Sequence, residues 1–349
     1  MIAKEYDTNL ILETKIGEYD VEFYDAKCEP FRIYGVWHDG ERYVRIPKDI
    51  AAGISKGIAY GYSSSAGGRI RFVTDSPYVA VKVVYALVGK NEVTPLSATV
   101  APEMTVDGDF GGVFRTTIDF SDDEHISVTD IRKEPGEHLI TLHMPTHSHV
   151  AEFYVGLKPG AKILHAPDYT YEKPVVFYGS SITHGTGATR AGTPYPSQIS
   201  KMIDTNFVNL GFGGLARGEA AMAEYISTLE MSAFVYDYDF NAPTAEHLEK
   251  THEPFFKIIR EKQPNLPIII SSRPSAFRVG KEATAERFAI IKKTYDNAKA
   301  NGDENVYLIN GLDYFPDESC DQLVDGTHPN DYGYTLMAKR IAEELKPLI

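Results

Sequence analysis

A serine in the second half of the chain has the setting of a nucleophile. Ser181 lies in the segment Gly179-Ser-Ser-Ile-Thr183, directly after the apolar stretch 175–178. A hydroxyl at the carboxyl end of a parallel strand lies where open α/β sheets build their sites. Ser181 is therefore the candidate nucleophile. The alternative is a serine that caps the N-terminus of the next helix.

A carboxylate and an imidazole lie together near the C-terminus. In the segment Asp325-Gly-Thr-His328-Pro-Asn, the aspartate precedes the histidine by three residues. One short turn can direct both side chains to one place, so that Asp325 holds one ring nitrogen of His328 while the other accepts the serine proton. The order along the chain is Ser, Asp, His. In the alternative interpretation, Asp325 caps a turn and His328 is merely exposed.

Two segments between these motifs offer oxyanion donors, which acyl transfer needs because negative charge develops on the former carbonyl oxygen. The first is the glycine turn Asn209-Leu-Gly-Phe-Gly-Gly214, where a residue without Cβ lets its backbone N–H approach a substrate closely. The second is Asn241, which ends the segment 234–241 and carries a side-chain N–H. Taken alone, Gly214 is a tight turn and Asn241 a loop cap.

The elements that must position these residues form a regular alternation after Pro174. Apolar strands alternate with helix-like stretches, which is the βαβ rhythm of a parallel sheet. The predicted strands are 175–178, 207–210, 233–236, 268–271 and 306–309, and the predicted helices are 244–260, 282–300 and 332–345. Each candidate residue except those of the last turn follows one of the first three strands.

The first half of the sequence has a different pattern of predicted secondary structure. Short β-rich segments between turn residues indicate a β-sandwich or jelly roll. The clearest strands are 69–73, 79–84, 138–143 and 151–155, and helical periodicity is scarce. The segment 159–174 is rich in Pro, Ala, Tyr and charge and is predicted to be the linker. We therefore expect two domains, a β-sandwich over residues 1–165 and an α/β domain over residues 166–349.

Composition narrows the classes of partner. Lys and Arg number 35 against 49 Asp and Glu, and the net charge of −14 argues against nucleic acid. No stretch approaches the roughly 20 apolar residues that span a bilayer, so no membrane partner is expected. Residues 1–7 lack the apolar core of a signal peptide, which favours a cytoplasmic protein. Cys28 and Cys320 are far apart and are interpreted as core thiols.

Several rival motifs are rejected. Gly53-Ile-Ser-Lys-Gly57 matches the G-x-S-x-G elbow of α/β-hydrolases, but Ser55 lies in the β-rich half without the strand and helix that the elbow needs. His147-Ser-His149 has no adjoining carboxylate or Cys cluster, so a solvated strand edge is favoured over a metal pair. Three further histidines, His184, His247 and His252, have no Asp at a comparable turn. No metal or other cofactor is expected.

Together the four segments resemble the SGNH (GDSL-like) hydrolase family, which is named for its Ser, Gly, Asn and His. The resemblance covers about residues 174–349. It implies a flavodoxin-like three-layer α/β/α fold and a serine esterase. The implied site residues are Ser181 as nucleophile, Asp325 and His328 as the rest of the triad, and the Ser181 N–H, Gly214 and Asn241 as oxyanion donors.

Two positions depart from the family pattern. Ser180 replaces the Asp of the usual Gly-Asp-Ser, at a position that supports the turn rather than the chemistry. Gly213 stands where a Ser is frequent, which leaves the local geometry of the glycine turn open.

The segments 67–77 and 143–157 resemble the β-sandwich that precedes certain SGNH esterases, which are similar to carbohydrate acetyl esterases. This second resemblance implies hydrolysis of short-chain acetyl esters of carbohydrates through an acyl-enzyme, with a small-molecule or oligosaccharide ester as partner. The alternatives are a non-catalytic carbohydrate-binding protein on a hydrolase scaffold, and a thioesterase or lipase with the same triad. A lipase for long acyl chains would need an apolar lid, and no such segment is evident.

Overall fold

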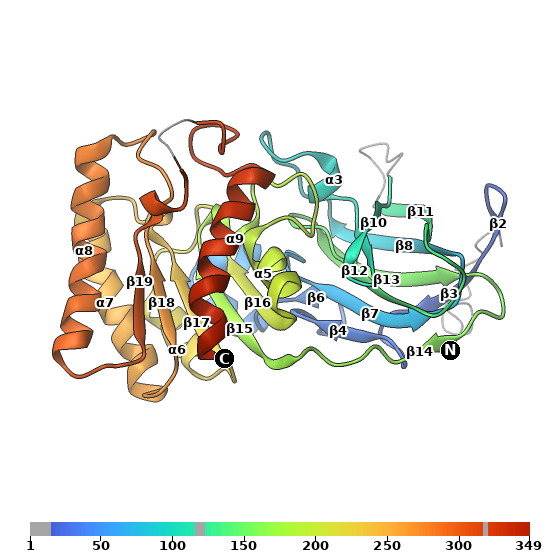
Figure 1. The fold of residues 1–349 in the computed structure, drawn as a ribbon, viewed down its shortest axis with the longest axis horizontal. Coiled ribbons are helices and arrows are strands. Elements are labelled where there is room, and N and C mark those ends of the chain that lie inside the picture. The colour runs from blue at the N-terminus through green and yellow to red at the C-terminus, as the bar shows by residue number, and fades with distance from the viewer. Residues whose placement is uncertain (1–14, 116–122, 317–319) are drawn as a thin grey trace. The chain divides into compact units, whose positions relative to one another are not determined.

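The computed structural model describes residues 15–115, 123–316 and 320–349, and the chain divides into two compact units (Figure 1). The first unit holds residues up to 45, 63–168 and 189–192, and the second holds 46–62, 169–188 and 193–349. Two short segments, 46–62 and 189–192, therefore fall on the other side of the boundary expected at residue 165. Residues 1–7, on which the expectation about a signal peptide depends, lie outside the described residues.

The first unit contains two main sheets, and every strand pair in it is antiparallel. One sheet has the order β10-β9-β12-β7-β14, with β4 also paired to β7, and the other has the order β11-β8-β13-β3. The strands of the first sheet are β4 (Arg32–Tyr34), β7 (Arg69–Thr74), β9 (Glu103–Val106), β10 (Asp109–Val113), β12 (His138–His143) and β14 (Ile163–Leu164). The strands of the second sheet are β3 (Glu22–Asp25), β8 (Tyr78–Leu87), β11 (Glu124–Asp130) and β13 (His149–Leu157). Smaller elements are β1 (Lys15–Ile16), β2 (Tyr19–Asp20), β5 (Trp37–His38), β6 (Tyr43–Val44) and the helix α3 (Leu96–Thr99).

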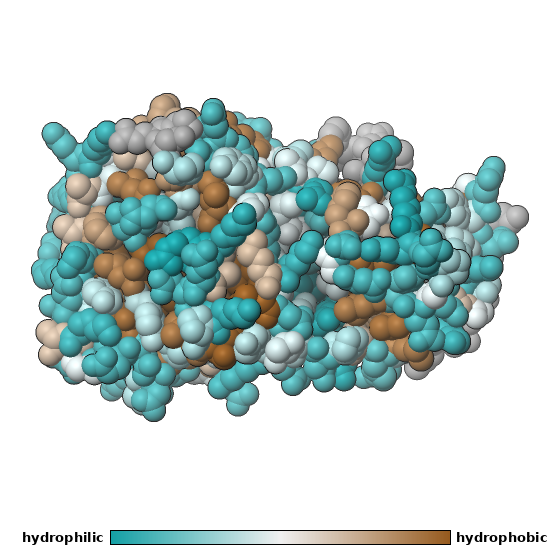
Figure 2. Space-filling view, viewed as in Figure 1, coloured by the Kyte–Doolittle hydropathy of each residue, from teal (hydrophilic) through white to brown (hydrophobic). Residues whose placement is uncertain are grey.

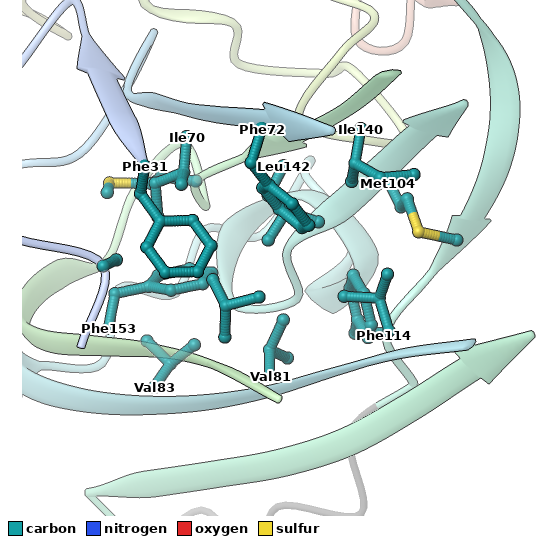
Figure 3. Close-up of a cluster of buried hydrophobic side chains, with 14 of the residues drawn as sticks. Phe31, Ile70, Phe72, Val81, Val83, Met104, Phe114, Ile140, Leu142 and Phe153 are labelled. Atoms are coloured by element: carbon teal, nitrogen blue, oxygen red, sulfur yellow. The ribbon is translucent and has the colours of Figure 1, made fainter. Parts of the chain in front are cut away.

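The two sheets enclose one hydrophobic core, which Figure 3 shows. Alternate side chains of a strand point to the same face, so each strand contributes every second residue. The core includes Ile70 and Phe72 of β7, Ile140 and Leu142 of β12, Val81 and Val83 of β8, and Phe153 of β13, all fully buried. Burial of each such side chain stabilises the fold by about 1.5–3 kcal/mol. The expected antiparallel β domain is confirmed.

The second unit is built on five parallel strands in the order β16-β15-β17-β18-β19. Counted along the chain this is the order 2-1-3-4-5 of a flavodoxin-like sheet. The strands are β15 (Tyr171–Gly179), β16 (Thr205–Gly211), β17 (Ala233–Asp237), β18 (Ile268–Ser271) and β19 (Val306–Ile309). The helices are α1 (Lys48–Ile54), α2 (Lys56–Gly61), α4 (Ser181–His184), α5 (Tyr195–Ile203), α6 (Ala220–Ser227), α7 (Ala245–Lys262), α8 (Lys281–Ala300) and α9 (Asp331–Leu345), with 3₁₀ turns η2 (Asp239–Asn241), η3 (Gly311–Asp313) and η4 (Lys346–Leu348).

Helices cover both faces of this sheet. Val175 and Phe177 of β15 lie in one core with residues of α5 and α9, which Figure 1 shows on the side of the sheet nearest the viewer. Tyr178, which points the other way, stacks on Phe255 of α7 with ring centroids 4.8 Å apart. The three-layer α/β/α arrangement expected for residues after 174 is therefore confirmed.

Two segments form structure that the sequence did not indicate. The helices α1 and α2 lie in the front half, yet they belong to the second unit. A Cβ on Gly57 would lie 2.9 Å from Leu215, so this glycine lets α2 approach the segment after β16 closely. In the expected linker 159–174, the strand β14 pairs with β7 and β15 begins at Tyr171.

Two interpretations of single residues are wrong. Cys28 and Cys320 are free thiols but only partly buried, so they are not core residues. His149 is buried as the first residue of an interior strand, where it bonds Ser63 Oγ at 2.9 Å, so the His147-Ser-His149 segment is not a solvated edge. Burial lowers the pKa of His149 to about 4.

The face in Figure 2 is largely hydrophilic, with hydrophobic side chains in scattered patches. Across the described ranges, none of the helices has the length and apolar character needed to cross a membrane. Within those same ranges, no group of three or more His, Cys, Asp or Glu residues is arranged to hold a metal ion.

Candidate active site

The candidate nucleophile is the first residue of a short helix. The Oγ of Ser180 accepts a hydrogen bond from the Ile182 N–H at 3.1 Å, so Ser180 is the N-cap of α4. The capping role considered for Ser181 is thus filled by its neighbour, at the position where the family pattern has Asp. Ser181 is partly exposed, and its Oγ does not take part in capping α4.

A buried polar layer supports the nucleophile turn. A Cβ on Gly179 would lie 2.1 Å from Thr183 Oγ1 and 2.3 Å from the Asp237 carbonyl, so only glycine fits there. The Asp237 carboxyl lies 3.4 Å from Thr183 Oγ1 and 3.3 Å from the Tyr195 hydroxyl. Burial raises the pKa of Asp237 well above its ordinary range, and the charge of Asp239 adds to the shift. Burial therefore favours the neutral form of this carboxyl.

The structure brings the three expected triad residues together. Ser181 Oγ lies 2.9 Å from His328 Nε2, and His328 Nδ1 lies 2.9 Å from Asp325 Oδ2. Because the carboxylate accepts the proton of Nδ1, the neutral ring presents an unprotonated Nε2 to the serine hydroxyl. This is the arrangement in which a histidine can take a proton from serine.

Asp325 also builds the turn on which it lies. Its Oδ1 accepts the backbone N–H groups of Thr327 at 3.0 Å and His328 at 2.8 Å, and Gly326, which follows Asp325, has a φ of 78°. Partial burial would raise the pKa of Asp325, but the hydrogen bonds from the His328 N–H, the His328 ring and the Thr327 N–H outweigh it and lower that pKa. Asp325 therefore caps a turn and orients the histidine at the same time.

The glycine turn and Asn241 meet, but in a different way from the one expected. Asn241 Nδ2 donates to the Phe212 carbonyl at 2.7 Å, and Asn241 Oδ1 accepts the Gly214 N–H at 3.2 Å. The reverse amide orientation would set two oxygens against each other and two N–H groups against each other. The side chain thus bridges both ends of the turn. The Gly214 N–H, expected to point toward a substrate, already has an acceptor.

Two candidate oxyanion donors each have a hydrogen that no described residue accepts. The Asn241 amide nitrogen carries a second hydrogen beyond the one given to Phe212. The backbone N–H of Ser181 makes no hydrogen bond to any residue that the structure describes. A Cβ on Gly213 would lie 3.6 Å from the Ser181 Cβ, which is an ordinary contact, so this position does not require glycine for space.

A buried ion cluster holds the turn that carries Asn241. The Asp239 carboxylate accepts from Arg273 Nε and Nη2, both at 3.0 Å, and from Arg287 Nε at 2.7 Å. All three residues are at most 6% exposed. Burial would raise the pKa of Asp239, but the hydrogen bond and charge of Arg273 and those of Arg287 lower it. The two arginines therefore favour the ionised form of Asp239, whereas burial favours the neutral form of Asp237.

The rival residues have structural roles. Ser55 is the N-cap of α2 and accepts the Ile58 N–H at 3.2 Å. His252 is buried against Thr294, and burial lowers its pKa to about 3. His247 Nε2 bonds the Arg217 carbonyl at 2.8 Å. None of these groups is bonded to Ser181.

Comparison with known proteins decides the family. The model of the GDSL-like lipase/acylhydrolase family matches residues 172–347, which is just over half of the chain. The chain belongs to this family. Residues 21–163 of this GDSL-like hydrolase match a second model, the N-terminal domain of SGNH-hydrolase-type esterases. The resemblance drawn from the four motifs is therefore confirmed. No curated protein sequence matches this GDSL-like hydrolase.

Three solved structures show the same two-domain fold. A protein from Bacteroides ovatus described as a GDSL-like lipase has a TM-score of 0.84 at 23% identity, with 94% of this chain and 98% of that chain covered. The salicylyl-acyltransferase SsfX3 from a tetracycline biosynthetic pathway has a TM-score of 0.77 at 22% identity, with coverage of 94% and 99%. An acetyl xylan esterase from Butyrivibrio proteoclasticus has a TM-score of 0.62 at 14% identity, with coverage of 94% and 98%. At these identities, the likeness shows the fold of this GDSL-like hydrolase and not its substrate.

The sequence motifs did not identify the buried charged residues that support the turns of the candidate site. Asp237 and Asp239 lie in the segment 234–241, which was singled out only for Asn241, and Arg273 and Arg287 lie outside the four motifs. Arg287 did carry a signal. The buried residues of α8 are Thr284, Arg287, Ile291, Thr294 and Ala298, so the arginine occupies a position of the apolar stripe, where an unpaired charge would be costly.

Proposed function

We propose that this GDSL-like hydrolase cleaves short-chain esters, chiefly acetyl esters of carbohydrates, through an acyl-enzyme intermediate. The observation that carries the proposal is the unbroken Ser181–His328–Asp325 relay, in which both contacts are 2.9 Å. A non-catalytic binding protein on the same scaffold would have no need of a histidine oriented in this way.

The geometry supports the following reaction. Ser181 Oγ attacks the ester carbonyl carbon while its proton passes to His328 Nε2. The resulting oxyanion accepts the Ser181 N–H and the second hydrogen of the Asn241 amide. The Gly214 N–H, whose bond to Asn241 is long at 3.2 Å, is available to be shared with it.

Formation and hydrolysis of the acyl-enzyme each pass one proton to His328 and one from it. The bond from carbonyl carbon to alcohol oxygen breaks as His328 returns its proton to that oxygen, and the alcohol leaves. Water then attacks the acyl-serine, gives its proton to Nε2 and releases the acid, and the proton returns to Ser181 Oγ. Asp325 stays ionised throughout and stabilises the imidazolium.

The acetyl and carbohydrate parts of the proposal are supported by solved structures that share the fold. A family two carbohydrate esterase from Clostridium thermocellum, solved in complex with cellohexaose, has the same fold with a TM-score of 0.59 at 15% identity. The acetyl xylan esterase from B. proteoclasticus shares the fold as well. Binding energy from a bulky alcohol can be used away from the reacting carbonyl, which favours an enzyme selective on the alcohol side.

The test compares acyl lengths and then alcohols. We expect kcat/KM to fall from acetyl through butyryl to octanoyl p-nitrophenyl esters, and we expect acetate release from acetylated xylooligosaccharides. The Ser181→Ala protein is the control for background hydrolysis. If octanoyl is preferred, or if a simple acyl thioester is cleaved fast while no acetylated sugar yields acetate, the carbohydrate part of the proposal fails. A folded protein that hydrolyses no ester would refute the enzyme itself.

A further inference from the structure

Two buried arginines hold the backbone on both sides of Asn241. Arg287 Nη2 donates to the Asp239 carbonyl at 2.5 Å and to the Ala242 carbonyl at 2.9 Å. These carbonyls flank Asn241 in the chain. The guanidinium of Arg287 therefore holds the backbone at the first residue of η2 and at the residue that follows it.

Arg273 holds the same turn from the neighbouring strand. It follows β18, and its guanidinium carbon lies 4.4 Å from the centre of the Phe240 ring, the residue just before Asn241. Its backbone N–H and its Nε both reach Asp239 Oδ2 at 3.0 Å. Both arginines thus bind the side chain of Asp239, while Arg273 also contacts the Phe240 ring and Arg287 also binds the Ala242 carbonyl.

Stability alone does not account for this cluster. A buried ion pair gains little over well-packed apolar residues of the same volume, because the charges must be removed from water. A catalytic donor, by contrast, must be held close to its productive position, since a displacement of about 1 Å costs about 10²-fold in rate. A rigid, planar guanidinium that binds a carboxylate and two carbonyls together meets that need.

We propose that Arg287, acting with Arg273 through Asp239, is a positioning residue that sets the Asn241 amide for the oxyanion. This inference rests on the proposed function, because it assigns a kinetic consequence to the cluster. Arg287 does not touch the reacting atoms. It acts on kcat only through the turn that carries Asn241.

The main variant is Arg287→Lys, because lysine keeps the positive charge but cannot bind the carboxylate and both carbonyls at once. We expect kcat for p-nitrophenyl acetate to fall about 10- to 100-fold, with KM changed by less than about 3-fold. Asn241→Ala should lower kcat by about 10²- to 10³-fold, as loss of an oxyanion donor does. In the Asn241→Ala background, Arg287→Lys should cost less than about 3-fold more.

Arg260→Lys is the matched control. Arg260 Nε binds Asp303 Oδ2 at 2.7 Å, and its Nη1 binds the Gln263, Pro264 and Leu266 carbonyls, so it is built in the same way at the far end of α7. It should lower the melting temperature without lowering kcat. All rates are measured well below each melting temperature, with far-UV circular dichroism as the check on folding.

Arg273→Lys serves as the second variant if Arg287→Lys does not fold, since it loosens the same turn through the Asp239 carboxylate. The inference is overturned if the folded variant keeps full kcat, or if only KM changes. It is also overturned if the losses in Arg287→Lys and Asn241→Ala multiply, or if Arg260→Lys loses kcat equally. A wild-type protein without esterase activity would overturn the proposed function and this inference with it. If the wild-type protein is an active esterase and any of the results listed for the arginine variants is found, only this inference is overturned.

Discussion

Asp325 has two tasks, and two substitutions should separate them. Its Oδ1 accepts the Thr327 and His328 backbone N–H groups, while its Oδ2 accepts the His328 ring N–H. In Asp325→Asn, the amide oxygen can keep both backbone bonds. The amide nitrogen then faces Nδ1 as a donor, which moves the ring proton to Nε2, where it blocks proton transfer from Ser181.

The expected magnitudes follow from that division. The wrong tautomer should lower kcat of Asp325→Asn by about 10⁴-fold, which corresponds to about 5.4 kcal/mol at about 1.36 kcal/mol per factor of ten. Its free energy of unfolding should change by less than about 1 kcal/mol. Asp325→Ala removes the acceptor of both backbone N–H groups at a side chain that is 27% exposed, so it should lose about 1 kcal/mol more.

A second Asp–His pair in the sandwich provides the control. Asp107 Oδ1 accepts the Leu139 N–H at 2.9 Å, and its Oδ2 lies 2.7 Å from His138 Nδ1. Asp107→Asn and Asp107→Ala should affect unfolding in urea but not kcat. The assays are p-nitrophenyl acetate hydrolysis and urea denaturation of all four variants. If Asp325→Asn keeps kcat within about 10-fold of wild type, or if Asp107→Asn loses as much, the assignment of Asp325 is wrong.

Two further predictions concern the nucleophile and the pH dependence of stability. Ser181→Ala should lower kcat by about 10⁶-fold with the fold intact. Ser55→Ala should keep kcat and lower the free energy of unfolding, measured in urea, by about 1 kcal/mol. The opposite pattern would make Ser55 the nucleophile and Ser181 the helix cap. Hydrogen bonds to Asp107 and to the Glu134 carbonyl raise the pKa of His138, so its contribution to stability is complete below the ordinary histidine pKa of about 6.5 and is lost as the pH rises through the folded value. The melting temperature of His138→Gln should therefore fall further below wild type at about pH 5.5 than at about pH 9, and an equal deficit at both would contradict the shift.

The sequence predicted elements well where periodicity is strong. All five parallel strands and the three long helices α7, α8 and α9 lie where apolar spacing placed them, within a few residues. The helices α1 and α2 were missed because they have only 7 and 6 residues and show no clear periodic pattern. Their place in the second unit depends on contacts such as that between Gly57 and Leu215, which no local pattern encodes.

In the candidate site, too, local sequence patterns predicted some residues, while contacts between distant segments determined others. Type and spacing brought Ser181, Asp325 and His328 together, because a strand end and a three-residue interval restrict where those side chains can lie. The bridging role of Asn241 was not predictable, since a motif gives the presence of an amide and not the partners of its two ends. Arg273 was missed as well, although it follows a strand at the same edge of the sheet.

The contacts within the second unit indicate that the site consists of two differently supported parts. The Ser180 N–H binds the Asp237 carbonyl at 3.3 Å, and Asn241 bridges the turn after β16. The loops after β15, β16, β17 and β18 are thus linked strand to strand, the last through Arg273. The 325–328 turn is instead closed upon itself by Asp325 and by the Val324 N–H, which binds the His328 carbonyl at 2.8 Å. The proposed nucleophile and oxyanion donors are therefore supported by one polar network, whereas His328 and Asp325 form a unit whose side chains meet Ser181 through the Oγ–Nε2 hydrogen bond.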